Sequence, residues 1–476
     1  MAPYPDSVIP NPGPEDIRPE RMHAVSAESR AIVEAVLDYS RGRALYEDIP
    51  LDVPATPAEL AEVASGSITA MGIGATRALA LFGDVLAPTC LSTDHPGYLA
   101  FIPSAPSKAA SAFDLVVSAS SIYAGSWLEG AGAVFAENEV LSWLASEFGL
   151  PDTAGGVFVQ GGTIGNLSAL VAARDDARRR NREAGRPDPA RWAVVCSAES
   201  HASVASAAAV MDIDVVGIHP DDDGRLHGHA VAEALAEHGE AVVAVVATAG
   251  TTNFGIVDDI AGIAEVTRRH GVWLHVDGAY GLAGMLVERM RPAYAGVEHA
   301  DSLIVDPHKW LFAPFDACAL IYRDPRIARR AHTQHASYLD TLTEAPETNP
   351  SDLSVQLTRR ARGLPLWFSL ATYGTDEYRS AIGRGIDMAR RIADEIERRD
   401  GLSLVRRPQL SVVVFRKDGW TRADYDAWSA RLLGDQRAFV VPSSHHGEPV
   451  LRFAIINPLT TYELLCEVLD TLNDSQ

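Results

Sequence analysis

The chain has 476 residues, 47% of them hydrophobic and 22% charged, enough for large buried cores in roughly two or three structural units. Its formal net charge of −22 excludes a nucleic-acid or anionic-membrane partner, because such a surface repels both, and no apolar run reaches the length of a membrane span. Four widely spaced cysteines without metal-ligand spacing, together with an acidic, Pro-rich N-terminus unlike a signal peptide, predict a cytoplasmic protein without a metal site.

The first 95 residues predict an arm followed by helices. Residues 1–20 have the composition of a loose segment, and apolar residues recur at helical spacing from Ala24 to Arg43. The run from Thr56 to Glu59 combines a cap, a proline at the first helical position and an acidic first turn. We expect an Ala- and Leu-rich helix from there to about Leu86.

Short apolar segments alternate with helical patterns through the centre of the chain. The segments expected to be strands are 156–159, 192–196, 241–247, 272–276 and 302–305. Continuous apolar runs are typical of strands buried on both faces, so the pattern predicts a mostly parallel, doubly wound α/β sheet. In such sheets, ligands bind at the carboxyl ends of the strands.

The last third of the chain begins with a polar, turn-rich segment over residues 340–357, which predicts a mobile loop. Beyond it, strand-like runs at 410–415 and 450–455 among helical stretches predict a small α+β domain. We therefore expect an N-terminal unit over 1–95, a large domain over 96–357 that includes the loop, and a small domain over 358–476.

Two motifs directly follow predicted strands. Val305-Asp306-Pro307-His308-Lys309-Trp310 contains a lysine that is either a solvated surface residue or a desolvated amine whose lowered pKa favours imine formation. His275-Val276-Asp277 contains a carboxylate that is either a cap or ion-pair partner, or the group that keeps a pyridine nitrogen protonated. Ala279 would then support one face of the ring.

Two more motifs also come directly after predicted strands. Gly161-Gly162-Thr163 lies between a strand and a helix, where it forms either a plain tight turn or a phosphate site at the helix N-terminus. His201 follows another strand, where it is either a hydrogen-bonded core residue or a ring that stacks on an aromatic cofactor and transfers protons.

These four motifs, in this order, resemble the group II pyridoxal-5′-phosphate (PLP) dependent amino-acid decarboxylases, the family of aromatic-L-amino-acid decarboxylase. Other matching segments are His95–Ala100, Thr248–Thr252, Asp258, Arg359-Arg360 with Leu366-Trp367, and Leu451–Phe453 with Asn457-Pro458, so the resemblance covers about residues 24–465. It implies PLP-dependent transferase fold type I, PLP as cofactor, and an obligate homodimer with sites at the interface and an N-terminal unit that wraps the partner.

The resemblance also implies a role for each site residue. Lys309 carries PLP as a Schiff base, Asp277 pairs with the pyridinium, and His201 and Ala279 lie on opposite ring faces. The other implied cofactor residues are Gly162, Thr163 and His308 around the phosphate, Thr252, and Asp258 beside the pyridine. The implied substrate-pocket residues are Phe101, Ile102, Pro103, Ser104, Gly125 and Trp127.

Two departures from the family pattern bear on the reaction. The family's mobile loop carries a tyrosine thought to protonate Cα after CO₂ leaves, whereas residues 339–358 contain none and the matching positions are Thr348, Asn349 and Pro350. Relatives without that tyrosine can make aldehydes. Aromatic-specific relatives also carry a bulky aromatic residue at the position of Gly125, so a larger or differently shaped pocket is expected.

The leading hypothesis is a carboxy-lyase of amino-acid metabolism that converts an L-amino acid to its amine and CO₂ through a Lys309 Schiff base and a quinonoid. The alternatives are decarboxylation coupled to oxidative deamination, which gives an aldehyde, and another PLP reaction such as transamination. A non-enzymatic PLP scaffold is disfavoured because Lys309, Asp277 and His201 are all present. Phe101, Ile102 and Trp127 favour an apolar or aromatic substrate side chain.

Overall fold

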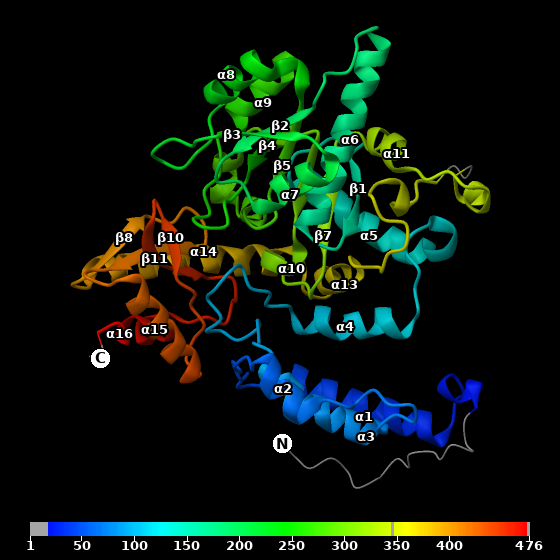
Figure 1. Cartoon of the computed structure of the whole chain (residues 1–476), viewed down its shortest axis with the longest axis vertical. Coiled ribbons are helices and arrows are strands. Elements are labelled where there is room, and N and C mark those ends of the chain that lie inside the picture. The colour runs from blue at the N-terminus through cyan, green and yellow to red at the C-terminus, as the bar shows by residue number, and fades with distance from the viewer. Residues whose placement is uncertain (1–17, 344–346, 474–476) are drawn as a thin grey trace.

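The computed structural model describes residues 18–343 and 347–473, and a seven-stranded sheet forms the centre of this part (Figure 1). Its spatial order is β1-β7-β6-β5-β4-β2-β3. The strands are β1 (Gly155–Val159), β2 (Ala193–Ser197), β3 (Asp214–Ile218), β4 (Val242–Thr248), β5 (Trp273–Asp277), β6 (Ser302–Val305) and β7 (Cys318–Tyr322). β7 runs antiparallel to β1 and β6, and the other neighbouring pairs are parallel. The mostly parallel sheet is confirmed, although the sequence pattern missed β3 and β7.

Helices cover both faces of this sheet. One core contains residues of α6 (Gly162–Glu183), α7 (Ala202–Met211) and α11 (Pro325–His332), and the other contains residues of α5 (Trp127–Glu147), α8 (Gly228–His238) and α9 (Ile260–His270). Successive side chains of a strand point to opposite faces, so Val157 and Val159 belong to the first core and Phe158 to the second. Because helices cover both faces of the sheet, the central strands are mostly apolar.

The described C-terminal residues form a small α+β unit, as expected. Its antiparallel sheet has the order β10-β11-β9-β8. The strands are β8 (Leu402–Arg406), β9 (Val412–Lys417), β10 (Ser443–His445) and β11 (Glu448–Ala454). Helices α14 (Thr375–Arg398), α15 (Arg422–Gly434) and α16 (Tyr462–Asp470) share one hydrophobic core with this sheet. α13 (Leu364–Tyr373) leads into the unit and packs on α4 (Lys108–Ala119).

The N-terminal helices lie apart from the central sheet, below α4 in Figure 1. They are α1 (Ala27–Ala44), α2 (Pro57–Ala64) and α3 (Ala75–Leu81). Thr56 and Glu59 form a capping box at the predicted start of α2. The expected continuous helix to Leu86 is wrong, because positive φ angles at Gly66, Gly72 and Gly74 separate α2 from α3. Residues 1–17 of the predicted arm lie outside the described residues.

The segment 340–357 is less open than its composition predicts. It begins with α12 (Asp340–Thr343), and residues 344–346 lie outside the described residues. Residues 349–354 are buried, and Asn349 Oδ1 accepts a hydrogen bond from the Trp127 N–H at 2.8 Å. Residues 349–354 therefore pack against the body of the protein, and the mobility of the segment stays a prediction.

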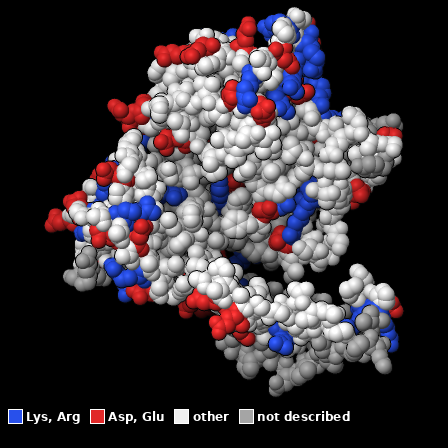
Figure 2. Space-filling model, viewed as in Figure 1, with Lys and Arg blue, Asp and Glu red and all other residues white. Residues whose placement is uncertain are grey.

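No helix within residues 18–343 and 347–473 has the length and apolar character that crossing a membrane requires. Figure 2 shows charged side chains mainly around the margin of one face, with a hollow between the N-terminal helices and the rest of the molecule.

Candidate active site

The motif residues converge where the central strands end. A methyl group on Gly162, at the start of α6, would lie 3.3 Å from the Ala279 Cβ and 3.3 Å from Asp306 Oδ2. Gly162 follows β1, Ala279 follows β5, and Asp306 follows β6. The turns after three strands therefore meet at one place, as the doubly wound topology requires.

Lys309 lies in α10 (Pro307–Trp310), immediately beyond β6. Its Nζ is 2.9 Å from Asp306 Oδ2, and the side chains of Lys309 and Asp306 are 20% and 2% exposed. Burial lowers the pKa of Lys309, but the negative charges of Asp306 and Asp277 outweigh burial and hold this pKa above its ordinary value. The expectation of a lowered pKa is therefore wrong for this arrangement, because Lys309 has a carboxylate partner three residues earlier.

Asp277 is held by hydrogen bonds from both sides. Its Oδ1 accepts from the Ala279 N–H at 3.2 Å, and its Oδ2 accepts from Asn166 Nδ2 at 2.9 Å. Because a carboxylate only accepts, the Asn166 amide must present its NH₂ to Asp277 and its oxygen to His275 Nε2, 2.8 Å away. Burial lowers the pKa of His275 to about 4, so His275 is a neutral imidazole with its proton on Nε2.

The Asn166 amide is also connected to His201 through hydrogen bonds. Asn166 Nδ2 also donates to Ser203 Oγ at 2.8 Å, and Ser203 Oγ lies 2.8 Å from His201 Nδ1. The Ser203 N–H points at the same nitrogen over 3.2 Å, so Nδ1 accepts and the ring proton of His201 is on Nε2. Hydrogen-bond donors thus point in one direction from His275 through Asn166 and Ser203 to His201.

The first turn of α6 is the candidate phosphate site. This helix has 22 residues and no side-chain cap, so its leading backbone N–H groups and its dipole favour an anion. His308 Cε1 would lie 3.7 Å from a methyl group on Gly161, and His308 Nδ1 is 2.7 Å from the Ala317 carbonyl oxygen. Thr163 is in the same turn, so Gly162 and Thr163 lie near His308 at the start of α6.

Four buried polar atoms beside the strand ends have no hydrogen-bond partner among the described residues. They are Gln160 Oε1, Ser200 Oγ, Thr248 Oγ1 and Asp306 Oδ1. Unpaired buried polar groups are costly, so their concentration near the ends of β1, β2, β4 and β6 fits a site for a polar ligand. An amine, a carboxylate and a helix N-terminus match the aldehyde, the pyridine nitrogen and the phosphate of PLP.

Asp258 and Thr252 lie near β4. Asp258 uses both carboxylate oxygens on backbone N–H groups, those of Leu226 at 2.9 Å and Thr248 at 2.7 Å. Burial raises the pKa of Asp258 to about 6, although these hydrogen bonds act against the shift. Asp258 therefore fixes the end of β4 through both of its carboxylate oxygens. Thr252 is half-buried in the following turn.

The implied pocket residues form two groups. Ser104 Oγ donates to the Ala313 carbonyl at 3.2 Å, which places the segment from Phe101 to Ser104 near the chain just beyond Lys309. Gly125 lies elsewhere, where a methyl group on it would be 2.3 Å from Tyr123 Oη and 2.7 Å from the Leu357 carbonyl oxygen. The Tyr123 side chain therefore lies directly beside Gly125, and a larger or differently shaped substrate pocket stays a prediction.

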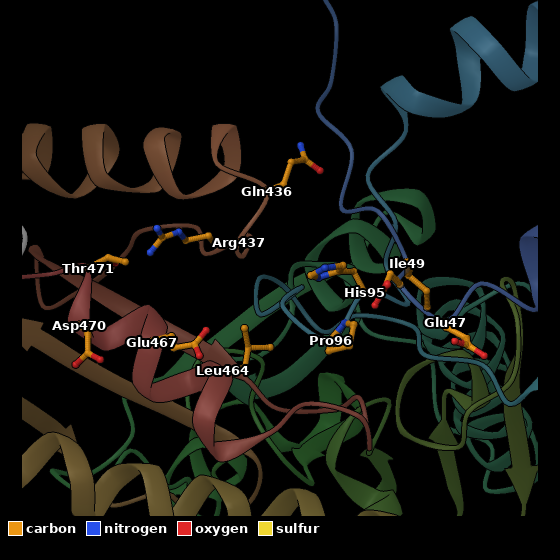
Figure 3. Close-up of a pocket in the computed structure, with 11 residues that line it drawn as sticks. Glu47, Ile49, His95, Pro96, Gln436, Arg437, Leu464, Glu467, Asp470 and Thr471 are labelled. Carbon is orange, nitrogen blue, oxygen red and sulfur yellow. The ribbon is translucent and has the colours of Figure 1, made fainter. Parts of the chain in front are cut away.

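A separate hollow of about 630 Å³ lies between the N-terminal connection and the small domain (Figure 3). His95 and Pro96 line it, opposite Leu464 and Glu467 of α16. The Pro96 carbonyl accepts from Thr460 Oγ1 at 2.7 Å. None of the expected cofactor residues lines this hollow, so the His-Pro-Gly motif contributes to the contact with the small domain.

Sequence reasoning assigned no role to Asn166, Ser203 or Asp306. Asn166 lies four residues after Gly162, one helical turn along α6, and Asp306 precedes Lys309 by three residues at the start of a helix. Residues three or four apart share one face of a helix, so this spacing is a signal that could have identified both. Ser203 offered no comparable signal, because its role depends on contact with a distant helix.

Comparisons with known proteins identify the family of this chain. The model of the pyridoxal-dependent decarboxylase conserved domain matches residues 73–418. An aromatic-L-amino-acid decarboxylase of Bacillus atrophaeus is 32% identical over 391 residues, which cover 79% of this chain and 80% of that protein. An L-2,4-diaminobutyrate decarboxylase of Rhizobium meliloti (strain 1021) is 32% identical over 420 residues, or 85% and 83% of the two chains.

Among solved structures, Oryza sativa TDC with PLP and tryptamine has a TM-score of 0.87 and 26% identity, over 96% of this chain and 99% of that chain. The chain belongs to the family of PLP-dependent amino-acid decarboxylases and has their fold type I architecture.

Proposed function

We propose that this enzyme removes the α-carboxylate of an L-amino acid as CO₂ and releases the corresponding amine. The observation that carries the proposal is the convergence of Lys309, Asp277 and the first turn of α6 at one edge of the sheet. When bound, PLP supplies a protonated pyridine ring that accepts the electron pair left at Cα when CO₂ departs.

The residues of the chain then have distinct tasks. Lys309 would hold the cofactor at its aldehyde carbon, and Asp277, oriented by Asn166, would keep the proton on the pyridine nitrogen. The backbone N–H groups of Gly162 and Thr163 bind the phosphate, with His308 beside them. His201 and Ala279 would lie against opposite faces of the ring, with Thr252 and Asp258 supporting the site from the end of β4.

We assign the proton that Cα needs to His201 Nε2. The Ser203 hydroxyl and backbone N–H both contact Nδ1 of the His201 ring, so Nε2 is the ring nitrogen left to carry a transferable proton. This assignment accounts for an amine product in a chain without a loop tyrosine. The ammonium of Lys309 and a residue of a partner subunit are the alternative donors.

Aldehyde formation is the second candidate. It is favoured by the absence of tyrosine from residues 339–358 and by the burial of Asn349 and Pro350, two of the positions that match the family's tyrosine. That route consumes one O₂ and one water molecule per amino acid and releases the aldehyde, CO₂, ammonia and hydrogen peroxide. Assays of CO₂, amine, aldehyde and peroxide on one reaction mixture separate the two routes.

The substrate is proposed to carry an apolar or aromatic side chain, because Phe101, Ile102 and Trp127 belong to the implied pocket. The Bacillus atrophaeus relative is named for aromatic amino acids, whereas the Rhizobium meliloti relative is named for 2,4-diaminobutyrate. A CO₂-release screen over the standard amino acids and 2,4-diaminobutyrate tests the choice. Borohydride reduction followed by peptide mapping tests Lys309, and cofactor found on another lysine would refute the central assignment.

We further propose a homodimer. None of the side chains of α1, α2 or α3 is buried, and Val33, Val63 and Ile68 are 56%, 60% and 96% exposed. Helices that leave so much apolar surface in water need a partner to cover it. Sedimentation at assay concentration should find a dimer, and a fully active monomer would contradict this assembly.

A further inference from the structure

We propose that Asp306 controls cofactor capture, by holding Lys309 as its ion-pair partner and by opposing the cofactor's phosphate at the first turn of α6. The inference rests on the proposed role of Lys309. It concerns a residue to which neither the motifs nor the comparisons assign a task.

The position of Asp306 supports both parts of this proposal. Its Oδ2 contacts Lys309 Nζ at 2.9 Å and also lies 3.3 Å from where a methyl group on Gly162 would be. The carboxylate therefore lies between the amine and the helix N-terminus that favours an anion. Its Oδ1 is buried and finds no donor among the described residues, so Lys309 is its main source of compensating charge.

The other titratable groups around Lys309 are Asp277, Cys318 and His308. Asp277 adds a second negative charge that raises the pKa of Lys309. Burial raises the pKa of Cys318 well above its ordinary value and lowers the pKa of His308, so both are neutral near pH 7. His308 Nε2 is 3.8 Å from Asp306 Oδ2, too far for a direct hydrogen bond. The pair thus consists of one cation and its nearest anion, without a competing charged histidine.

Before the cofactor can bind covalently, the ion pair of Lys309 and Asp306 must separate. Lys309 must first lose a proton to solvent, because only the neutral amine attacks an aldehyde. The nitrogen lone pair then forms the C–N bond, and one water molecule leaves as the C=N bond is completed. The cofactor's phosphate, with a charge of about −1.5 to −2 at pH 7 if it resembles a phosphorylated side chain, must meanwhile approach the Asp306 carboxylate. The ion pair and the charge repulsion both oppose capture at neutral pH.

The experiment measures the capture of PLP and of unphosphorylated pyridoxal by the full-length protein after cofactor removal. Absorbance follows the covalent complex between pH 6 and 10 for wild type, Asp306→Asn and Asp306→Glu. For Asp306→Asn, we expect the pH midpoint of pyridoxal capture to fall by about one to three units, the usual effect of removing an adjacent opposite charge. The preference for PLP over pyridoxal should also rise roughly tenfold or more, because a repulsive charge has been removed.

Asp306→Glu is the matched variant that retains the charge, so its pH midpoint should stay near that of wild type. Asp306→Ser replaces Asp306→Asn if the latter does not fold, as judged by circular dichroism and thermal unfolding. An Asp306→Asn protein that captures both aldehydes with the wild-type pH midpoint, or captures PLP more weakly, would overturn the proposal. If wild type captured neither aldehyde on Lys309 at any pH, the proposed function itself would fail.

Discussion

Asn166 Nδ2 and Asp277 Oδ2 are 2.9 Å apart, in a hydrogen bond that connects α6 to the end of β5. The bond is charge-assisted and buried, and the opposite side of the amide is fixed by His275. Asn166→Ala should therefore lower kcat roughly tenfold, since a hydrogen bond to a charged group contributes about 1.5–3 kcal/mol. Asn166→Asp should cost more, because it places two carboxylates side by side.

Asn181→Ala on the exposed end of the same helix is the control, and its kcat should match wild type. The cofactor's absorbance spectrum should change in the Asn166 variants and not in Asn181→Ala. An Asn166→Ala enzyme with wild-type kcat and spectrum would show that Asp277 does not depend on this amide.

Replacing Asp277 itself should separate cofactor binding from turnover. Asp277→Asn keeps the shape of the side chain but removes the charge that retains the pyridine proton, so bound PLP should persist while kcat falls roughly 10²-fold or more. Cofactor content by absorbance and kcat from CO₂ release are the two measurements. Near-normal turnover in this variant would exclude the proposed role.

The sequence predicts the parts of this molecule that depend on local pattern. The buried strands from β1 to β6, apart from β3, follow from their continuous apolar runs. β3 does not, because most of its residues are exposed and it has no such run. The helix expected to reach Leu86 fails because Gly66, Gly72 and Gly74 adopt positive φ angles that separate α2 from α3.

The site could be predicted as a set of residues but not as a network. Lys309, Asp277 and His201 each follow a strand, and that topology alone brings them to one edge of the sheet. Their electrostatics depend on partners distant in sequence, such as Asn166 for Asp277, or on a charge beside the motif, as Asp306 is for Lys309. The sequence therefore predicts a lowered pKa for Lys309, which is wrong because the charges of Asp306 and Asp277 outweigh burial.

Tyr123 and Gly125 should be coupled in stability. A side chain at Gly125 would collide with the Tyr123 ring, so Gly125→Phe should destabilise the fold by about 1–3 kcal/mol, the usual cost of overpacking. Adding Tyr123→Ala should recover part of that loss, because the Leu357 carbonyl oxygen still crowds the position, and the double variant should show changed substrate preference in the CO₂ screen. Gly132→Phe on α5 is the control, because no atom lies within 4 Å of a methyl group there. If the effects of Gly125→Phe and Tyr123→Ala on the free energy of unfolding in urea simply added, the two positions would not be coupled.

The ion pair of Arg359 and Glu137 should hold the chain beyond the 340–357 segment against α5. The two side chains are 0% and 3% exposed, and their contacts are 2.7 and 2.8 Å. Glu137→Gln leaves the guanidinium buried without its counter-charge, so the free energy of unfolding should fall by about 3–5 kcal/mol. The exposed pair of Arg422 and Asp426 is the control, and Asp426→Asn should change little. If Glu137→Gln and Asp426→Asn lowered the free energy of unfolding in urea equally, the buried pair would not be the more important one.

The proton donor to Cα can be tested by removing His201 and introducing a tyrosine in the 340–357 segment. His201→Asn removes the Nε2 proton, so the share of aldehyde and peroxide in the products should rise at the expense of amine. A tyrosine at the exposed Thr348 is tolerated sterically, whereas one at Pro350 would have to enter a buried site. Thr348→Tyr in the His201→Asn background should therefore restore amine, because a positioned general acid contributes about 10²–10⁴-fold to its step. Thr348→Phe is the control without the acidic hydroxyl. If His201→Asn makes only amine under oxygen, His201 is not the donor and Lys309 becomes the next residue to test.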